Sequence, residues 1–245
     1  MNGDIKQNFF EEIKNGKDPK CCTELLAGIA PKKLFKYFRP NENAGKSLIE
    51  QYLWHSAPDQ LNDPYDSQLG WIGDVSIGDD DFLKGINRSF SKGLKICSFS
   101  EVNDSILMWG HYALNHTGFC VEFDFIDLLS TPFSMQLYPI HYSNDLLDLN
   151  SCYKSGLNLY NIAILASIAK NEGWIYEKEW RLFMWDTIIS NRIPCPLPTA
   201  IYFGSKIDFT DPMIQLVREF AFKNGIRQYL MVRAIDKFEL RIESL

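Results

Sequence analysis

The chain has 245 residues, a formal net charge of −6 at pH 7, and 46% hydrophobic residues. This length accommodates one large domain or two small ones, and the hydrophobic content is sufficient for a substantial core. The acidic balance argues against a protein that coats nucleic acid non-specifically, although a local basic groove is compatible with it.

Two features of the sequence bear on its cellular location. The apolar stretch between Lys154 and Lys170 carries no charge, and it is too short to span a bilayer. Residues 1–17 lack the apolar core of a signal peptide. We therefore expect a cytoplasmic protein with no membrane partner.

The six cysteines form no C-x-x-C pair, and Cys97 and Cys120 lie in apolar strand patterns. We therefore expect the cysteines to be reduced thiols with a structural role. A site built from these two thiols with His111 and His116 has no recognisable zinc spacing, so we expect no metal.

The N-terminal third predicts two helices followed by the first core strand. Residues 5–15 and 23–27 are expected to be helical, each ended by a glycine, and to form an N-terminal helical cap over residues 1–30. The apolar run 34–38 predicts a strand. The next expected elements are a helix at 47–52, a strand at 53–58, a polar turn at 61–66, a mobile insert at 73–81 and a helix at 82–90.

The central unit, residues 96–125, predicts a strand, a capped helix and a second strand. Asn103 or Asp104 is expected to cap the helix, because either side chain can accept from the free N–H groups of its first turn. Asp104, Met108 and His111 would then share one stripe of the helix.

The C-terminal half continues the mixture of strands and helices. Residues 174–183 read as an extended run in which Glu177, Glu179 and Arg181 share one face and Trp180 lies on the other. The remaining expected elements are extended residues 137–142, a mostly helical segment 146–171, strands at 200–204, 229–233 and 238–242, and an amphipathic helix at 211–222. Without regular β-α alternation, this predicts one α+β domain over residues 31–245, with a central mixed or antiparallel sheet and flanking helices.

Three polar clusters are candidates for a site. In the first, the Glu177 and Glu179 carboxyl groups would repel, so one should have a raised pKa unless a cation lies between them. A solvated strand face paired with Arg181 is the plain alternative. The second cluster has Trp109, His111, Tyr112 and His116, which suit base stacking or proton transfer or simply pack. The third has Asn62, Asp63 and Asp66, which an ordinary turn also explains.

Several of these segments resemble the family catalogued as domain of unknown function 2971. The segments are LFKY, HSAP, LNDPYD, CSFSE, LMWGHYALNHTGFCVEFD and WIYEKEWRL, and together they extend roughly from Leu34 to Gly204. The family commonly has an arginine directly after the first strand's KY, whereas Phe38 stands here and Arg39 follows. The resemblance implies a fold and recurrent polar positions, but no established reaction.

The order of the motifs resembles that of ADP-ribosyltransferases. In those enzymes a basic or histidine residue on an early strand precedes a serine or aromatic residue, and a glutamate pair follows on a late strand. Lys36 or Arg39, then His55-Ser56, then Glu177 and Glu179 follow this order. NAD would be the substrate, and Glu179 would stabilise the positive charge that develops on the ribose as nicotinamide leaves.

Two other functions remain open from the sequence. One is a metal-independent nuclease or hydrolase that uses His111 and His116 with the acids Glu101, Asp104 and Glu177. The other is a sensor or effector module that binds a nucleotide-like small molecule without catalysis; a protein or nucleic acid is a further possible target.

The proposed catalytic residues are Glu179, Glu177, His111 and His116. The proposed ligand-binding residues are Lys36, Tyr37, Arg39, Ser56, Asn62, Asp63, Asp66, Ser100, Glu101, Trp109, Tyr112 and Arg181. Lys36, Asn62, Asp63, His111, His116 and Glu179 are expected to line one concave surface.

Overall fold

A computed structural model describes residues 2–67, 93–130, 136–185 and 190–245. The expected insert at 73–81 and the expected helix at 82–90 lie outside these residues.

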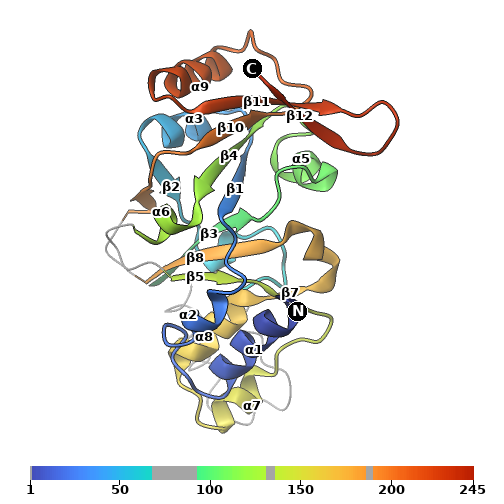
Figure 1. Ribbon diagram of the computed structural model, residues 1–245. Helices are drawn as coiled ribbons and strands as arrows, with labels where there is room; N and C mark the ends of the chain where they lie inside the picture. The colour runs from blue at the N-terminus through green and yellow to red at the C-terminus, as the bar shows by residue number, and fades with distance from the viewer. Residues whose placement is uncertain (1, 68–92, 131–135, 186–189) are drawn as a thin grey trace.

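An eight-stranded mixed sheet forms the centre of the fold, in the order β12-β11-β10-β4-β1-β3-β8-β5 (Figure 1). Its neighbouring strands pair antiparallel, except for the parallel pair β10–β11. The strands are β1 (Lys33–Phe38), β3 (Leu94–Ser100), β4 (Phe119–Asp124), β5 (Gln136–Pro139), β8 (Glu179–Trp185), β10 (Ala200–Phe203), β11 (Arg227–Arg233) and β12 (Leu240–Ser244). Two small pairs accompany it: β2 (Tyr52–Trp54) with β9 (Arg192–Pro194), and β6 (His141–Ser143) with β7 (Ala169–Asn171). The predicted α+β class with a mixed sheet is confirmed.

The helices gather at the two ends of the sheet. Figure 1 shows α3 (Glu42–Ile49) and α9 (Pro212–Lys223) at one end, and α1, α2, α7 and α8 at the other. The latter four are α1 (Asn2–Lys14), α2 (Thr23–Leu26), α7 (Leu149–Lys154) and α8 (Leu159–Ile168). The remaining helical elements are α5 (Ile106–Tyr112), α6 (Phe125–Leu129) and the 3-10 turns η1 (Pro58–Gln60) and η2 (Glu172–Glu177). None of the helices that the structure describes is long and apolar enough to cross a membrane.

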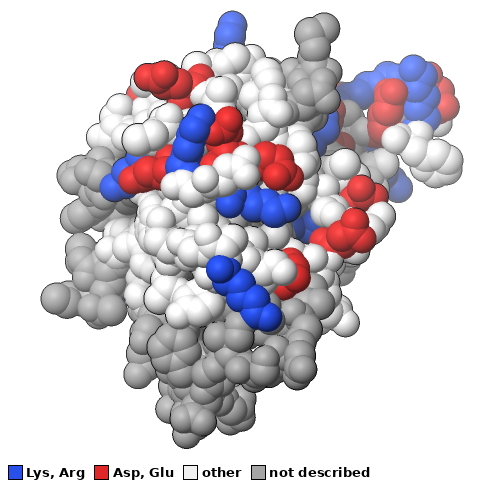
Figure 2. All heavy atoms as spheres, turned by 90° about the horizontal axis from the view of Figure 1, so that it is seen from below, with Lys and Arg blue, Asp and Glu red and all other residues white. Residues whose placement is uncertain are grey.

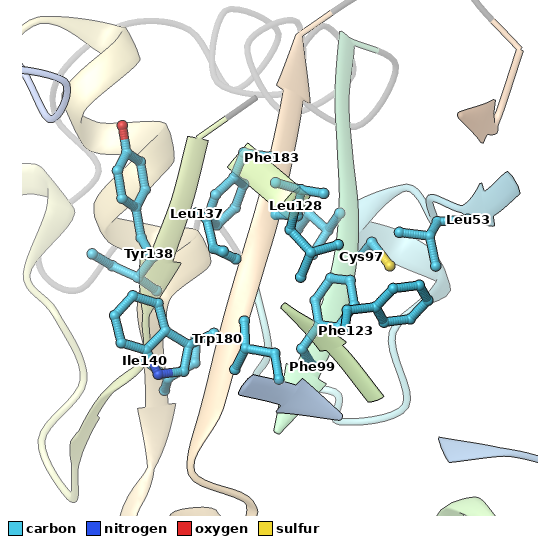
Figure 3. Close-up of a cluster of buried hydrophobic side chains, with 14 of the residues drawn as sticks. Leu53, Cys97, Phe99, Phe123, Leu128, Leu137, Tyr138, Ile140, Trp180 and Phe183 are labelled. Carbon is cyan, nitrogen blue, oxygen red and sulfur yellow. The ribbon is translucent and has the colours of Figure 1, made fainter. Parts of the chain in front are cut away.

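One hydrophobic cluster joins the sheet to helices at both ends. Figure 3 shows its centre, where side chains from β3, β4, β5 and β8 meet Leu128 of α6. Trp180 is fully buried there, with its ring 5.2 Å from that of Phe125. Phe9 of α1 belongs to the same cluster, its ring 5.2 Å from that of Tyr138. The N-terminal helices therefore pack into the same core as the sheet.

The surface contrasts with this core. On the face seen in Figure 2, lysine and arginine side chains lie beside aspartate and glutamate side chains over the described residues. Neither sign of charge forms a continuous patch on that face.

Three sequence-based expectations about the elements are wrong. The hydroxyl of Ser105, and neither Asn103 nor Asp104, caps α5 by accepting from the Met108 N–H. The helix expected at 47–52 spans Glu42–Ile49, because the Asn41 side chain caps it earlier. The segment 146–171 is mostly helical, as expected, in α7 and α8, and its last residues form β7. Residues 174–177 form part of η2 and not of a strand, because the backbone turns at Lys178, which has a left-handed φ of 43°.

Candidate functional site

The register between β3 and β8 gathers polar side chains on one face of the sheet. Ser98 lies opposite Arg181, and Ser100 lies opposite Glu179. Residues directly opposite in an antiparallel pair project to the same face, so these four side chains are neighbours. Trp180 projects to the opposite face. The predicted alternation of Glu179 and Arg181 against Trp180 is confirmed.

Arg181 is the centre of a buried ionic network. Its guanidinium donates to both Asp66 oxygens, Nη1 to Oδ1 at 2.7 Å and Nη2 to Oδ2 at 2.5 Å, and its Nε donates to Glu179 Oε1 at 2.8 Å. Nη1 also donates to the carbonyl oxygen of Ser167 at 2.6 Å. Burial would lower the pKa of Arg181, but the charges of Glu179 and Asp66 outweigh it and raise the pKa well above its usual value. Arg181 therefore stays charged and fixes both carboxylates.

Lys170 joins the two glutamates, and the sequence analysis missed it. Its Nζ donates to Glu177 Oε2 at 2.5 Å and to Glu179 Oε2 at 2.9 Å, and it lies 3.9 Å from Asp66 Oδ2. The cluster thus contains three carboxyl groups and two cations, which leaves one negative charge when all five are ionised. The sequence left open whether a cation lies between the two glutamates, and the ammonium of Lys170 does lie there.

The two glutamates have pKa values displaced in opposite directions. Burial opposes ionisation of Glu179, but the charges of Arg181 and Lys170 outweigh it and lower its pKa to about 2. Burial raises the pKa of Glu177 above its usual range, against the charge of Lys170. Glu179 is therefore a fixed negative charge, whereas Glu177 is the group that can exchange a proton.

Tyr112 holds the second oxygen of Glu177. Its hydroxyl donates to Glu177 Oε1 at 2.5 Å and accepts from the Asn62 side-chain amide at 3.3 Å. Burial raises the pKa of Tyr112, so the phenol remains a hydrogen-bond donor at neutral pH. Helix α5 is anchored beside it by Trp109, which is fully buried and donates its indole N–H to the Asn103 carbonyl at 2.6 Å. The carboxyl group of Glu177 is thus held from both sides.

These groups line a cavity of about 130 Å³, which we call the acid cavity. This volume is below the range that encloses a whole drug-sized ligand, so the cavity would receive one ring-sized part of a larger molecule. Lys36 is one of the residues that line the cavity, and its Nζ donates to the Ser98 carbonyl at 3.1 Å. The other lining residues are Phe35, Tyr37, Leu61, Asn62, Asp66, Ser98, Phe99, Ser100, Met108, Tyr112, Lys170, Glu177, Glu179 and Arg181.

Nine of the sixteen proposed site residues lie at the acid cavity. They are Lys36, Tyr37, Asn62, Asp66, Ser100, Tyr112, Glu177, Glu179 and Arg181. The residues outside its lining are Arg39, Ser56, Asp63, Glu101, Trp109, His111 and His116. The expectation of one shared concave surface is confirmed for Lys36, Asn62 and Glu179, and it is wrong for Asp63, His111 and His116.

The residues outside the cavity have identifiable contacts elsewhere. The Asp63 carboxylate accepts from the Tyr65 N–H at 2.9 Å, which is the contact expected if Asp63 belongs to an ordinary turn. Glu101 accepts the indole N–H of the core residue Trp180 at 2.6 Å. Ser56 pairs with Ile96 through the backbone, Arg39 is exposed, and Trp109 is a core residue.

The two histidines of the central unit do not share a pocket. His111 is exposed, and its ring lies 6.5 Å from Trp174 and 6.3 Å from Tyr176. His116 stacks on Trp109 at 6.4 Å and lines a separate pocket. Helical and turn spacing in the sequence could not reveal that the two rings point to different surroundings.

Within the described ranges, no group of three or more His, Cys, Asp or Glu side chains is arranged to hold a metal ion. Asp66, Glu177 and Glu179 come close together, but Lys170 and Arg181 occupy the positions between them. These two cations supply the positive charge that a metal would otherwise provide.

Comparison with known proteins adds one finding. The chain matches no curated protein and no solved structure. Residues 108–182 match the model of the family described as Protein of unknown function (DUF2971), a segment that includes Tyr112, Lys170 and the two glutamates and confirms the resemblance there.

Proposed function

We propose that the protein is an ADP-ribosyltransferase-like enzyme that cleaves the N-glycosidic bond between nicotinamide and ribose in NAD. One observation carries this proposal. Glu177 and Glu179 adjoin at one cavity, share the ammonium of Lys170, and have pKa values displaced in opposite directions. Carboxyl pairs separated in this way divide proton transfer from charge stabilisation.

The two glutamates would have different roles in the reaction. The bond between C1′ of the ribose and the nicotinamide nitrogen breaks, and its electron pair leaves with nicotinamide. Positive charge then develops on the ribose, which the ionised carboxylate of Glu179 would stabilise without first having to reorganise. An acceptor oxygen bonds to C1′, and its proton passes to the ionised carboxylate of Glu177, which acts as general base.

The walls of the cavity suit one end of such a substrate. Tyr37 and Tyr112 line the cavity with aromatic residues, against which a nicotinamide ring can pack. Lys36 of β1 also lines the cavity, although its ammonium lies 5.5 Å from the centre of the Phe99 ring. The pyrophosphate would extend outside the small cavity, and its contact with Lys36 stays a prediction.

The test measures nicotinamide release from NAD by liquid chromatography, with water and with added protein as acceptors. We expect turnover by the wild type and a loss of about a hundredfold or more in Glu179→Gln. Glu177→Gln should lose less nicotinamide release, because its carboxylate serves the acceptor. Glu122→Gln is the matched control. Its carboxyl group is also buried on a sheet strand, where it accepts from Thr199 and Tyr202, and it lies outside the cavity.

Thermal unfolding of each variant must accompany the assay, since Glu179 also binds Arg181. A folded Glu179→Gln that retains full activity would contradict the proposal, as would a wild type that releases no nicotinamide with any acceptor. Cleavage of RNA or DNA without NAD consumption would instead support the hydrolase alternative. Binding of NAD without turnover would support the sensor alternative.

A further inference from the structure

A second pocket lies between the turn after α5 and the hairpin formed by β11 and β12. Figure 1 shows this hairpin extending beyond the sheet, next to α5. The pocket has a volume of about 840 Å³, and its lining shares no residue with the acid cavity. We call it the hairpin pocket. Its polar lining includes His116, Ser205, Lys206 and Arg233, and its apolar wall includes Ile106 and Val232.

Two cations in the hairpin pocket, Lys206 and Arg233, have no acidic partner among the residues that the structure describes. The two acids that line the pocket pair with other cations, Asp236 with Arg241 at 2.9 Å and Glu239 with Lys237 at 3.7 Å. Over the part of the chain that the structure describes, neither Lys206 nor Arg233 forms an ion pair. Unpaired positive charge at one pocket favours an anionic ligand.

His116 lies within the influence of both cations. Burial, and then the charges of Lys206 and Arg233, lower the pKa of His116, so the three side chains are close enough to interact. Two polar atoms of the lining residues, Nδ1 of His116 and Oγ of Ser205, are buried without a hydrogen-bond partner among the described residues. An unsatisfied buried polar atom costs free energy, so its presence in a native fold calls for an explanation.

The backbone under this site is fixed in a strained conformation. Leu114, Asn115 and His116 have left-handed φ values of 47°, 54° and 71°. Each such residue costs about 1 kcal/mol or more, and strain of this kind clusters at binding and catalytic sites. The Lys206 N–H donates to the His116 carbonyl at 3.0 Å, which ties the strained turn to the segment that carries Ser205 and Lys206. The backbone that carries His116, Ser205 and Lys206 is therefore held in place before a ligand arrives.

We propose that the hairpin pocket binds a phosphorylated small molecule of nucleotide size. Its phosphate would lie among Lys206, Arg233 and His116, since a phosphate offers only acceptors to these donors. The organic part would pack on Ile106 and Val232, and the pocket volume is within the range for small-molecule sites. A nucleic-acid chain fits less well, because the protein carries a net charge of −6 and these cations lie in a pocket. This site is independent of the proposed NAD cleavage.

The first experiment is isothermal titration calorimetry with adenosine 5′-monophosphate, adenosine and inorganic phosphate as probes. We expect the nucleotide to bind more tightly than either part alone. Lys206→Gln and Arg233→Gln should each weaken nucleotide binding by about tenfold or more, which is the effect of losing a charge-assisted contact. Lys223→Gln is the matched control, because it removes an exposed lysine that pairs with Glu219 on α9, outside the pocket. It should leave the affinity unchanged.

The second experiment locates the ligand by NMR of the histidine rings. The chain has four histidines, so comparison with His116→Gln assigns the His116 signal. The nucleotide should shift this signal in the wild type and in Glu177→Gln, but not in the Lys206→Gln/Arg233→Gln double variant. Nucleotide binding that Glu177→Gln abolishes and the double variant retains would place the ligand in the acid cavity and overturn the proposal. The absence of binding, phosphate binding as tight as that of the nucleotide, or affinity that rises with oligonucleotide length would also overturn it.

Discussion

Replacing the buried lysine between the two glutamates is the most direct test of the ionic network. In Lys170→Met, a side chain of similar length removes the ammonium that donates to Glu177 at 2.5 Å and to Glu179 at 2.9 Å. The Lys170 and Glu177 side chains are each only 4% exposed, so water cannot replace the lost contact. The variant therefore leaves two adjacent carboxyl groups with less compensating charge.

The expected loss follows from the network itself. Lowering the pKa of Glu179 from 4.5 to about 2 corresponds to about 3 kcal/mol of stability at neutral pH, and Lys170 is one of its two cations. Removing one partner from a buried ion pair commonly costs about 3–5 kcal/mol. We therefore expect Lys170→Met to lower the free energy of unfolding by about 3 kcal/mol at neutral pH.

The loss should also depend on pH. Without Lys170, the folded-state pKa of Glu177 rises further and that of Glu179 returns upward. A carboxyl group whose pKa is higher in the folded than in the unfolded state destabilises the fold at high pH. This penalty shrinks as the pH falls through the folded-state pKa, and it is gone below the unfolded-state pKa. The wild type keeps the contribution of Glu179 until the pH falls below 4.5 towards 2. The difference between the two proteins should therefore shrink from neutral pH towards 4.5.

Urea unfolding at about pH 7.5 and about pH 5, followed by tryptophan fluorescence, measures this difference. Lys33→Met is the matched control, since Lys33 also bridges two acids, Glu122 at 3.2 Å and Asp124 at 3.0 Å, but is 33% exposed. Its loss should cost at most about 1 kcal/mol. Adding Glu177→Gln to Lys170→Met should recover part of the stability. A Lys170→Met protein as stable as the wild type, or a loss that is equal at both pH values, would refute the reasoning.

Three further predictions concern packing and capping. Trp180→Ala should lower the free energy of unfolding by about 3–5 kcal/mol, because the fully buried indole also donates to Glu101; an unchanged melting temperature would contradict this. Asp211→Ala should cost about 1 kcal/mol in urea unfolding, because its carboxylate accepts from two N–H groups at the start of α9, whereas Asp211→Asn should retain most of the stability. Gly204→Ala should lower the free energy of unfolding by about 1–3 kcal/mol, because the added Cβ would lie 2.2 Å from the His116 carbonyl oxygen. Thermal unfolding measures this loss, and an unchanged stability would show that the backbone at His116 can move away from the added Cβ.

Patterns local in the sequence predicted most of the sheet. The apolar run at 34–38 predicted β1, and the alternation of Glu179 and Arg181 against Trp180 predicted the faces of β8. These predictions succeed because the two faces of a strand alternate along the chain. The cap of α5 was misplaced because Asn103, Asp104 and Ser105 are adjacent residues of capping type, and spacing alone does not select among them.

The candidate site could be predicted only in part, because its decisive contacts join distant segments. Asp66 and Arg181 are 115 residues apart and give no local signal of their pairing. Lys170 appeared to be part of a long helix, whereas the chain leaves α8 and forms β7 there, which brings its ammonium between the glutamates. The left-handed Lys178 likewise places Glu177 outside the strand without a glycine to indicate the turn.

The last prediction concerns the proton-transfer role of Glu177. Burial raises the pKa of Glu177, and the hydrogen bond from Tyr112 is among the contacts that oppose this rise, so Tyr112→Phe should raise the pKa further. A general base works only when ionised, so activity falls as the pH drops through its pKa. The acidic limb of the pH profile for NAD turnover should therefore move to higher pH, by about one pH unit for one hydrogen bond to a charged group.

Tyr37→Phe is the matched control for this prediction, because Tyr37 lines the same cavity but donates its hydroxyl to the Val102 carbonyl at 2.9 Å. It should leave the acidic limb in place even if the maximal rate falls. Equal displacement of the limb in both variants would indicate a general effect on the cavity. If the acidic limb of Tyr112→Phe does not move, the group that titrates in catalysis is not Glu177. Loss of the hydrogen bond from Tyr112 must change the pKa of Glu177, and the pH profile would show no such change.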